Sequence, residues 1–247
     1  MGAIDVDGQS ERLTVTDLVV RYGKVNAVNG VTLAIGRGEV VAIIGPNSAG
    51  KSSLLEAIGA KMPGRTVGGT VTFGGHAVLP LETRARWHAG IRLVPQGRQI
   101  YPTLSVADNI RVIAENLGVD WKNVLDGSSN LFPAEFTDRL KLRLKVPAGN
   151  LSGGEQQMLV LARALVGEAR MLLLDEPALG FAPRITQEFA SAIHRWADAG
   201  IGILITDQSL RRWADVVDRV YILVRGTLSE YGRAEESIDQ LIARLMG

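Results

Sequence analysis

The sequence predicts an α/β protein with a mainly parallel β-sheet, and two repeated patterns support this class. Short runs that are apolar throughout, such as EVVAIIG at residues 39–45, are typical of strands buried on both faces of a sheet. Segments with apolar residues at helical spacing alternate with these runs, as in PRITQEFASAIHRWADAG at residues 183–200. Strands and helices that alternate in this way favour a parallel sheet covered by helices.

The first part of the chain contains two kinds of expected strand. Residues 12–23 (RLTVTDLVVRYG) and 30–36 (GVTLAIG) alternate apolar and polar residues, which indicates strands of a half-exposed antiparallel sheet. The buried strand at 39–45 is followed by a glycine-rich loop and by KSSLLEAIGAKM at 51–62, whose apolar residues have helical spacing. This order of strand, glycine loop and helix is the context that a phosphate-binding loop requires.

The second half of the sheet has its own signals. Three further buried strands are expected at residues 91–95 (IRLVP), 169–177 (ARMLLLDEP) and 201–208 (IGILITDQ). Residues 219–232 (RVYILVRGTLSEYG) indicate a hairpin that turns at Arg225 and Gly226. The segment AEESIDQLIARLM at 234–246 has the pattern of an amphipathic helix that closes the chain.

Residues 97–158 differ from the rest, because they contain helical patterns and no evident buried strand. The clearest helices are expected within 105–118 (SVADNIRVIAENLG) and 134–144 (AEFTDRLKLRL), whereas turn-forming residues at 118–130 predict an irregular loop. We therefore expect a helical subdomain inserted between two strands of the core. The expected single domain consists of a core and β subdomain at about 11–96 and 159–233, a helical subdomain at about 97–158 and a C-terminal helix at 234–247.

The composition narrows the class of function. The 27 basic and 26 acidic side chains give a net charge of +1, which argues against general affinity for nucleic acid. The chain has no cysteine, and its three histidines are far apart, so the sequence offers no thiolate or histidine metal site. No apolar run approaches the ~18 residues that a membrane span needs, so we expect a cytoplasmic chain without an anchor of its own.

The stretch GPNSAGKSS at residues 45–53 has the pattern of a phosphate-binding loop. Gly45, Gly50, Lys51 and Ser52 satisfy the pattern G-x-x-x-x-G-K-[ST], in which glycines let successive backbone N–H groups turn toward phosphates. The helix that follows adds the positive end of its dipole. We expect Lys51 to neutralise the β- and γ-phosphates and the Ser52 hydroxyl to bind Mg²⁺.

The stretch MLLLDEP at residues 171–177 places two carboxylates at the end of a buried strand. Asp175 is expected to hold the magnesium ion through water, and Glu176 to orient or deprotonate the attacking water. A pair of carboxylates solvated at a strand end is the alternative, and the phosphate loop weighs against it. Together, the two stretches predict a nucleotide hydrolase.

A second candidate anion site lies in LSGGEQQ at residues 151–157. Ser152, Gly153 and Gly154 stand before a helix, and a glycine-bearing helix N-terminus is a place where anions bind. Without a second lysine-bearing loop, such a site makes sense if it completes the nucleotide site of a neighbouring protomer. The residues alone also fit an ordinary serine cap on an amphipathic helix.

From about residue 12 to 240, the chain resembles the ATP-binding subunits of ABC transporters. GPNSAGKSS is similar to their Walker A, LSGGEQQ to their signature and MLLLDEP to their Walker B. The resemblance implies ATP and Mg²⁺ as ligands and a P-loop NTPase (RecA-like) core sheet with an antiparallel β subdomain and an inserted helical subdomain. The ATP-binding residues that it implies are Gly45, Pro46, Asn47, Ser48, Ala49, Gly50, Lys51, Ser52 and Ser53 of Walker A, and Ser152, Gly153, Gly154 and Glu155 of the signature.

The resemblance also implies roles for residues outside these three motifs. VVRYG is similar to the aromatic loop, which implies that Tyr22 stacks on adenine. LVPQG is similar to the glutamine loop, which implies that Gln96 senses magnesium and the γ-phosphate while it contacts the membrane subunit. The implied catalytic residues are Glu176, Gln208 and Gln96, and the implied metal ligands are Ser52, Gln96 and Asp175.

The departures from the family pattern include three single positions. Ser48 stands where glycine is usual, and serine costs on the order of 1 kcal/mol if that position requires a positive φ. Ser53 replaces the usual threonine, which is a mild change. Gln208 in ILITDQS replaces a switch histidine, and an amide can donate a hydrogen bond to a phosphate oxygen but cannot take a proton. A plain helix-start role for Gln208 stays open.

Longer stretches of the sequence indicate which group of ABC ATPases the chain resembles. VPQGRQIYPTLSVADNI, LSGGEQQM and DEPALGFAP together are similar to the ATPases of branched-chain, or hydrophobic, amino-acid importers. Urea and short-amide importers share much of this pattern, and ITDQS has a slight similarity to lipid or lipopolysaccharide exporter ATPases. Rivals from other classes are a soluble ABC ATPase acting on ribosomes or DNA and a catalytically silent regulatory subunit.

The resemblance thus implies an energising ATPase subunit, peripheral on the inner face of the cell membrane. Its implied partners are ATP, transmembrane permease subunits and a second ATPase subunit in a homodimer or heterodimer, with no nucleic acid. Two subunits would clamp two ATP molecules head to tail, so that ATP does mechanical work on a transporter.

Overall fold

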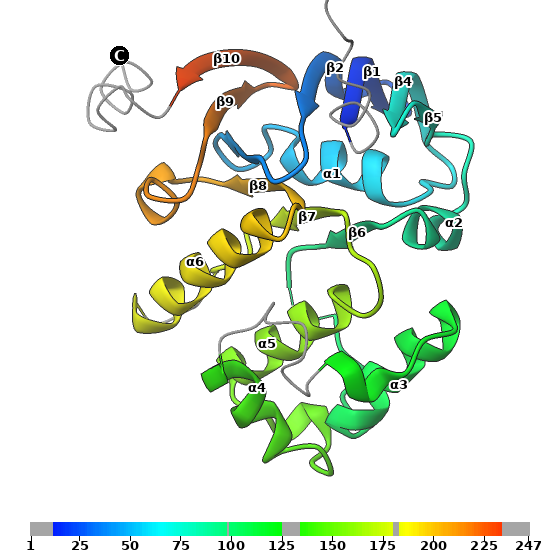
Figure 1. Cartoon of the computed structure of the whole chain (residues 1–247). Coiled ribbons are helices and arrows are strands. Elements are labelled where there is room, and N and C mark those ends of the chain that lie inside the picture. The colour runs from blue at the N-terminus through cyan, green and yellow to red at the C-terminus, as the bar shows by residue number, and fades with distance from the viewer. Residues whose placement is uncertain (1–11, 98, 125–133, 180–182, 234–247) are drawn as a thin grey trace, which may run out of the picture.

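The structure is a computed structural model that describes residues 12–97, 99–124, 134–179 and 183–233. Two sheets and the helix between them occupy the upper part of Figure 1, and a group of helices occupies the lower part. The closing helix expected at 234–246 lies outside the described residues, as do residues 125–130 of the loop expected at 118–130.

A four-stranded antiparallel sheet contains the first strands of the chain. Its strands are β1 (Leu13–Tyr22), β2 (Val25–Ile35), β4 (Thr66–Phe73) and β5 (His76–Ala77). Their order is β2-β1-β4-β5, so that β1 is flanked by β2 on one side and by β4 on the other. The two strands expected from alternation are therefore present and paired with each other.

Strand β4 was not predicted from the sequence, because glycines interrupt its alternation. Gly69 has a φ of 87°, and a Cβ there would lie 2.4 Å from the carbonyl oxygen of Asp17 on β1. The close approach of β1 and β4 at this bulge therefore requires a glycine. Gly69 is thus required by the contact with β1, and it also breaks the alternating pattern by which a strand is recognised in the sequence.

The larger sheet is mainly parallel, as predicted. Its strands are β3 (Val40–Ile44), β6 (Ile91–Val94), β7 (Met171–Asp175), β8 (Gly202–Asp207), β9 (Arg219–Val224) and β10 (Thr227–Arg233). Their order is β10-β9-β3-β8-β7-β6, and only β10 runs antiparallel to its neighbour. The β9–β10 hairpin turns at Arg225 and Gly226, whose φ angles of 49° and 78° fit a two-residue type I′ turn.

The helices lie on both faces of this sheet (Figure 1). Helix α1 (Lys51–Gly59) lies between the two sheets, and α6 (Pro183–Asp198) lies on the other side of the larger sheet. Helices α3 (Val106–Leu117), α4 (Ala134–Lys141) and α5 (Gly153–Ala164) gather at the end remote from the antiparallel sheet. Among the described residues, no helix is both long and apolar enough to cross a membrane.

Short helical elements complete the chain. Helix α2 (Thr83–His88) was not predicted. Single 3₁₀ turns occupy Trp121–Val124, Ala148–Asn150 and Leu210–Arg212. The first of these turns falls in the segment that was expected to be irregular.

Strand β3 divides the core into two parts. Val41 and Ile43 pack with α1 and the antiparallel sheet, whereas Val40, Ala42 and Ile44 pack on the opposite face with residues of α5 and α6. All five side chains are buried. A strand buried on both faces reads as a continuous apolar run, which explains why this strand was evident from the sequence.

Candidate active site

The loop between β3 and α1 is shaped by two glycines that approach other backbone segments closely. A Cβ on Gly45 would lie 2.2 Å from the carbonyl oxygen of Leu223, and a Cβ on Gly50 would lie 2.2 Å from that of Ala27. Gly50 also has a φ of 106°, which L-residues rarely adopt. The two glycines therefore allow the loop to press against β9 and β2 before it enters α1.

Ser48 departs from the glycine that is usual in this loop, and its backbone adopts a φ of 64°. The condition that would make serine costly is therefore met. Left-handed backbone places the Cβ too close to the carbonyl oxygen, which costs on the order of 1 kcal/mol. The loop keeps its shape in spite of the serine.

The Lys51 ammonium group is buried at the start of α1 and is surrounded by oxygen atoms. Its Nζ donates hydrogen bonds to the carbonyl oxygens of Gly45 (2.9 Å) and Pro46 (3.1 Å). It also lies 3.2 Å from Oε1 of Glu176, in an ion pair whose side chains are 4% and 7% exposed. Three acceptors thus match the three N–H donors of a cation that is removed from water.

Asp175 is the last residue of β7, and the chain turns away from the strand at Glu176. The Asp175 carboxylate is buried, and its Oδ1 accepts a hydrogen bond from the hydroxyl of Thr206 on β8 (2.6 Å). Glu176 has a φ of 44°, which is uncommon for a residue other than glycine. Its N–H donates to the carbonyl oxygen of Thr206 (2.9 Å), which fixes this unusual backbone. The turn brings the Glu176 carboxylate to Lys51.

Two glutamines complete the cluster around Glu176. The Gln96 Nε2 donates to Oε2 of Glu176 (3.2 Å), and the Gln208 Nε2 lies 3.3 Å and 3.2 Å from its two carboxylate oxygens. Gln96 follows β6, Glu176 follows β7 and Gln208 follows β8, which are adjacent parallel strands. Ligands of α/β sheets bind at such carboxyl ends of strands.

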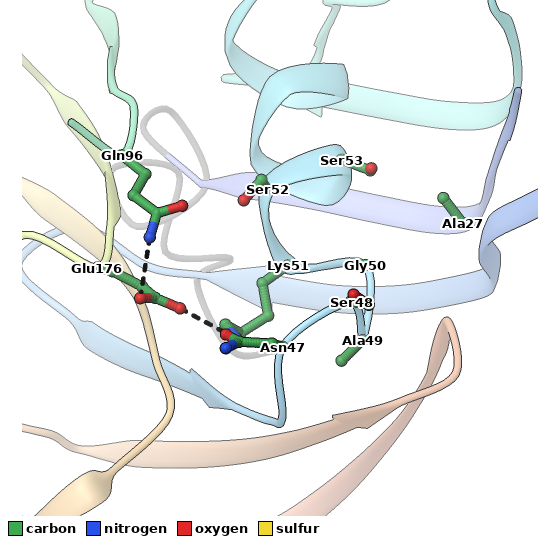
Figure 2. Close-up of a pocket in the computed structure, with 10 residues that line it drawn as sticks. All are labelled: Ala27, Asn47, Ser48, Ala49, Gly50, Lys51, Ser52, Ser53, Gln96 and Glu176. Atoms are coloured by element: carbon green, nitrogen blue, oxygen red, sulfur yellow. Dashed lines mark hydrogen bonds and ion pairs between the residues drawn. The ribbon is translucent and has the colours of Figure 1, made fainter.

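Figure 2 shows the pocket that these groups share with the glycine loop. Its volume is about 200 Å³, and it is lined by Ala27, Asn47, Ser48, Ala49, Gly50, Lys51, Ser52, Ser53, Gln96 and Glu176. In this view the Ser52 hydroxyl points toward the side of Gln96, and the Ser53 hydroxyl points toward the side of Ala27. Pockets for whole drug-sized ligands have about 300–1,000 Å³, so this one suits a phosphate chain.

Tyr22 is connected to the pocket through Ser53. The two hydroxyl oxygens lie 3.0 Å apart, and either hydroxyl can donate the hydrogen bond. Tyr22 is not among the described residues that line the pocket, so it stands beside the phosphate space and not in it. Stacking of adenine on Tyr22 stays a prediction.

The signature residues form a separate structure at the N-terminus of α5. The Ser152 hydroxyl accepts a hydrogen bond from the Glu155 N–H (3.4 Å), and the Glu155 carboxylate accepts from the Ser152 N–H (2.8 Å) and hydroxyl (2.7 Å). This reciprocal arrangement is a capping box. None of Ser152, Gly153, Gly154 and Glu155 is among the described residues that line the pocket. The serine cap left open by the sequence is therefore present, and the anion site for a neighbour stays a prediction.

The charge of Glu155 is stabilised by its partners. Partial burial acts to raise the pKa of Glu155, but the hydrogen bonds from Ser152 and the Arg143 guanidinium outweigh it and lower the pKa below its ordinary value. Arg143 lies 3.6 Å from Oε1 of Glu155. The capping carboxylate therefore stays ionised at neutral pH.

Asp207 is a site residue that sequence reasoning missed. Its buried carboxylate accepts hydrogen bonds from the N–H groups of Gln208 (2.6 Å) and Ser209 (3.2 Å) and from Nε1 of Trp213 (2.8 Å). Arg212 adds an ion pair at 3.4 Å. Asp207 thus fixes the turn that carries Gln208. The one signal in the sequence is a carboxylate at a buried strand end, directly before Gln208.

Comparison with known proteins agrees with this geometry. The family described as ABC transporter matches residues 28–179. The high-affinity branched-chain amino acid transport ATP-binding protein BraG of Pseudomonas aeruginosa is 34% identical, over 84% of this chain and 86% of that protein. The probable branched-chain amino acid transport ATP-binding protein LivF of Archaeoglobus fulgidus is 30% identical, over 88% and 90%. The lipopolysaccharide export system ATP-binding protein LptB of Escherichia coli K12 is 32% identical, over 94% and 95%.

Solved structures give the same assignment. The crystal structure of an ABC transporter's ATP-binding cassette in its ADP conformation has a TM-score of 0.76 and 26% identity, over 94% of this chain and 95% of that one. A nucleotide-free cassette has a TM-score of 0.77 and 27% identity, over the same shares of the two chains. The chain therefore belongs to the ABC transporter family, as one of its ATP-binding and ATP-hydrolysing subunits.

Proposed function

We propose that this subunit binds ATP with its phosphates in the pocket of Figure 2 and thereby energises an importer of branched-chain or other hydrophobic amino acids. The observation that carries the proposal is the convergence of Lys51, Gln96 and Gln208 on Glu176. A cation for the phosphates, a carboxylate for water and neutral donors are the groups that phosphoryl transfer to water uses.

Lys51 and Glu176 take separate roles once ATP enters. The phosphates replace Glu176 and the loop carbonyls as partners of the Lys51 ammonium, because they offer more negative charge. Glu176 is then available to accept a proton from water as the water oxygen attacks the γ-phosphorus and the bond to ADP breaks. Gln96 and Gln208 already donate to Glu176, so they support the orientation of its carboxylate.

The residues also fit a magnesium ion that arrives with the nucleotide. The Ser52 hydroxyl, the Asp175 carboxylate and the Gln96 amide oxygen are hard oxygen donors, which Mg²⁺ prefers alongside phosphate oxygens. Among the described residues, no group of three or more His, Cys, Asp or Glu side chains is placed to hold a metal. When bound, the ion would neutralise charge on the β- and γ-phosphates.

We also propose that two ATPase subunits pair head to tail around two ATP molecules. Ser152, Gly153 and Gly154 would face the γ-phosphate held by Lys51 of the other subunit. Two features support this arrangement: these residues lie at the N-terminus of α5, where the helix dipole favours anions, and they do not line the pocket of their own chain. ATP then closes the pair, and hydrolysis reopens it.

Family membership supports membrane partners in general, whereas the proposed cargo depends on particular relatives and motifs. Membrane permease subunits are the partners of an ABC transporter ATPase, and we propose that they dock beside Gln96 and the helical subdomain, on the inner face of the membrane. The relatives named for branched-chain amino acids support that cargo, whereas one relative is named for lipopolysaccharide export. The importer motifs VPQGRQIYPTLSVADNI and DEPALGFAP favour amino acids.

Size-exclusion chromatography of the Glu176→Gln variant, with and without ATP and magnesium, tests the nucleotide sandwich. We expect a shift to a dimer that depends on ATP and disappears when Ser152 is also changed to Phe. A variant that binds ATP and stays monomeric would contradict self-pairing, and a histidine-bearing second ATPase would then be added to the same assay.

Uptake of radiolabelled leucine by cells that lack this subunit tests the cargo. We expect uptake to fall and to return when the wild-type chain is supplied, but not when the Lys51→Ala variant is supplied. Unchanged uptake of leucine, with loss of urea uptake or of lipopolysaccharide export, would contradict the amino-acid proposal.

A further inference from the structure

The Tyr22 ring carries a cation on one of its faces. The Cζ atom of Arg65 lies 4.8 Å from the centroid of the Tyr22 ring, within the range of a cation–π interaction. Arg65 is not part of the Walker A loop, the signature or any other motif. It directly precedes β4, on the connection that follows α1.

The local backbone explains how Arg65 reaches this position. The Arg65 N–H donates to the Met62 carbonyl oxygen (3.3 Å), and Gly64 between them has a φ of 73°, so the connection turns tightly before β4. In the β1–β4 ladder, Arg21 pairs with Thr66. The next pair of this antiparallel register is Tyr22 and Arg65, and directly opposite side chains lie on one face of a sheet.

The strand order shows which face of the ring Arg65 covers. On its other side, Tyr22 pairs with Val25 of β2, and β2 and β4 flank β1 on opposite sides. The phosphate pocket reaches β2 at Ala27. Arg65 therefore covers the face of Tyr22 that is turned toward β4, and the face turned toward β2 is the one on the pocket side.

Two further observations suit a planar ligand on that second face. The Tyr22 hydroxyl is hydrogen-bonded to Ser53, which lines the pocket, so the edge of the ring is tied to α1. Val25 is 65% exposed, which is high for a large apolar side chain in a strand. The ring is thus held at its edge and on one face, and an exposed apolar side chain flanks the other.

We propose that Arg65 is a positioning residue for the nucleotide base: it supports Tyr22 from the β4 side, so that the base stacks on the opposite face of the ring, beside Val25. The proposal rests on the proposed function, in which the base stacks on Tyr22. A side chain that is already oriented loses less conformational freedom when the ligand binds. The guanidinium, the phenol ring and the base form one continuous stack.

This arrangement predicts what Arg65 does and does not recognise. Stacking uses the π-face that every base has, and it is tolerant of base identity. Arg65 is therefore expected to strengthen the binding of ATP and GTP by a similar factor. It is not expected to affect a ligand that has phosphates and no base.

Titration calorimetry on the full chain tests the proposal with ATP and with inorganic tripolyphosphate as probes. We expect Arg65→Ala to weaken ATP binding about two- to fivefold, the size of an exposed cation–π contact, and to leave tripolyphosphate binding unchanged. Arg65→Lys should recover part of the ATP affinity. The matched control is Lys61→Ala, which removes another exposed cation from the same connection, one that is paired with Glu82 and not with an aromatic ring. We expect it to bind both probes as the wild type does.

A double-mutant cycle with Tyr22→Ala separates the possible outcomes. We expect Arg65→Ala to have no further effect in the Tyr22→Ala background, because its effect passes through the ring. If Arg65→Ala weakens ATP or tripolyphosphate equally in both backgrounds, Arg65 acts as a charge and the proposal is overturned. If Tyr22→Ala weakens ATP and Arg65→Ala does not, only this inference fails. If Tyr22→Ala leaves ATP affinity unchanged, the proposed base site itself fails. Circular dichroism confirms that each variant is folded.

Discussion

The ammonium group of Lys51 lies 3.2 Å from the carboxylate of Glu176, although the two residues belong to different motifs. In the proposed reaction, one of these groups binds phosphate and the other activates water. Here each group is the other's partner, in a pair that is almost fully buried. An incoming phosphate must therefore compete with the enzyme's own carboxylate for Lys51.

The first prediction follows from this competition. Glu176→Gln removes the negative charge beside Lys51, so we expect ATP to bind about tenfold more tightly, which corresponds to about 1.4 kcal/mol. The same change removes the general base, so kcat is expected to fall by about 10²–10⁴. Calorimetry and a phosphate-release assay measure the two effects. Glu82→Gln, which neutralises an exposed carboxylate on another segment, serves as the control. Unchanged ATP affinity in Glu176→Gln would contradict the competition.

Gln208 gives a prediction about pH, because its amide does not titrate. We expect Gln208→His to introduce a transition in kcat at or above the ordinary histidine pKa of about 6.5, because the neighbouring Glu176 carboxylate favours the imidazolium. Below that pH the imidazolium would pair with Glu176 and keep it from water, so the rate should fall as the pH falls. Gln208→Ala should lose about tenfold in kcat without any new transition, because Glu176 loses a hydrogen-bond donor. Rates measured from about pH 5 to about pH 8 decide the matter, and identical profiles for wild type and Gln208→His would refute the prediction.

The motifs could be predicted from the sequence because each is local. The glycine loop, the buried strand before Asp175 and the helix after Ser152 each occupy one short stretch with a characteristic pattern. The ion pair of Lys51 and Glu176 was not predicted, because it joins residues far apart in the chain through the order of strands β3, β8 and β7. The patterns identify the groups, and the sheet decides which groups meet.

Helix α2 shows why another part of the fold was missed. Its Arg86 is buried, and the guanidinium Nη1 donates to the carbonyl oxygens of Ala57 (2.7 Å), Ile58 (2.9 Å) and Ala60 (2.8 Å) at the C-terminal end of α1. The last carbonyl groups of a helix lack hydrogen-bond donors within the helix, and this arginine supplies such donors. Burial lowers the pKa of Arg86, which is consistent with a cation inside the protein. A helix of six residues that is held by tertiary contacts such as these leaves no periodic pattern in the sequence.

The backbone of Ser48 gives a prediction about stability. Because its φ is 64°, Ser48→Gly should raise the free energy of unfolding by about 0.5–1 kcal/mol, through relief of strain that exceeds the entropy cost of glycine. Ser48→Val should lower it by more than about 1 kcal/mol, because a β-branched side chain fits this conformation poorly. Ser48→Ala keeps a Cβ and removes the hydroxyl, which makes it the control for the side chain. Urea unfolding measures all three, and Ser48→Gly without a gain would contradict the prediction, because the strain at Ser48 would then not exceed the entropy cost of glycine.

The capping box at the signature gives the last prediction. The hydrogen bonds from Ser152 and the charge of Arg143 lower the pKa of Glu155 in the folded state. A carboxyl group with a lowered folded pKa stabilises the fold above its unfolded pKa of about 4.3, and this contribution is lost as the pH falls through the folded value. The stability that Glu155 adds is thus fully present at neutral pH and disappears in acid.

The matched variants are Glu155→Gln and Ser152→Ala. At neutral pH we expect Ser152→Ala to lower the free energy of unfolding by about 1 kcal/mol, the usual effect of a lost N-cap. We expect Glu155→Gln to be less stable than wild type at neutral pH and to approach it in acid, as the pH falls through the lowered folded pKa of Glu155 and the carboxylate is protonated. Carbon-13 NMR titration of the Glu155 carboxyl group measures its pKa directly. A measured pKa above about 4.3, or a stability difference that grows in acid, would show that the Ser152 and Arg143 contacts do not hold the charged form. The N-terminus of α5 would then lack the fixed geometry that a partner's phosphate requires.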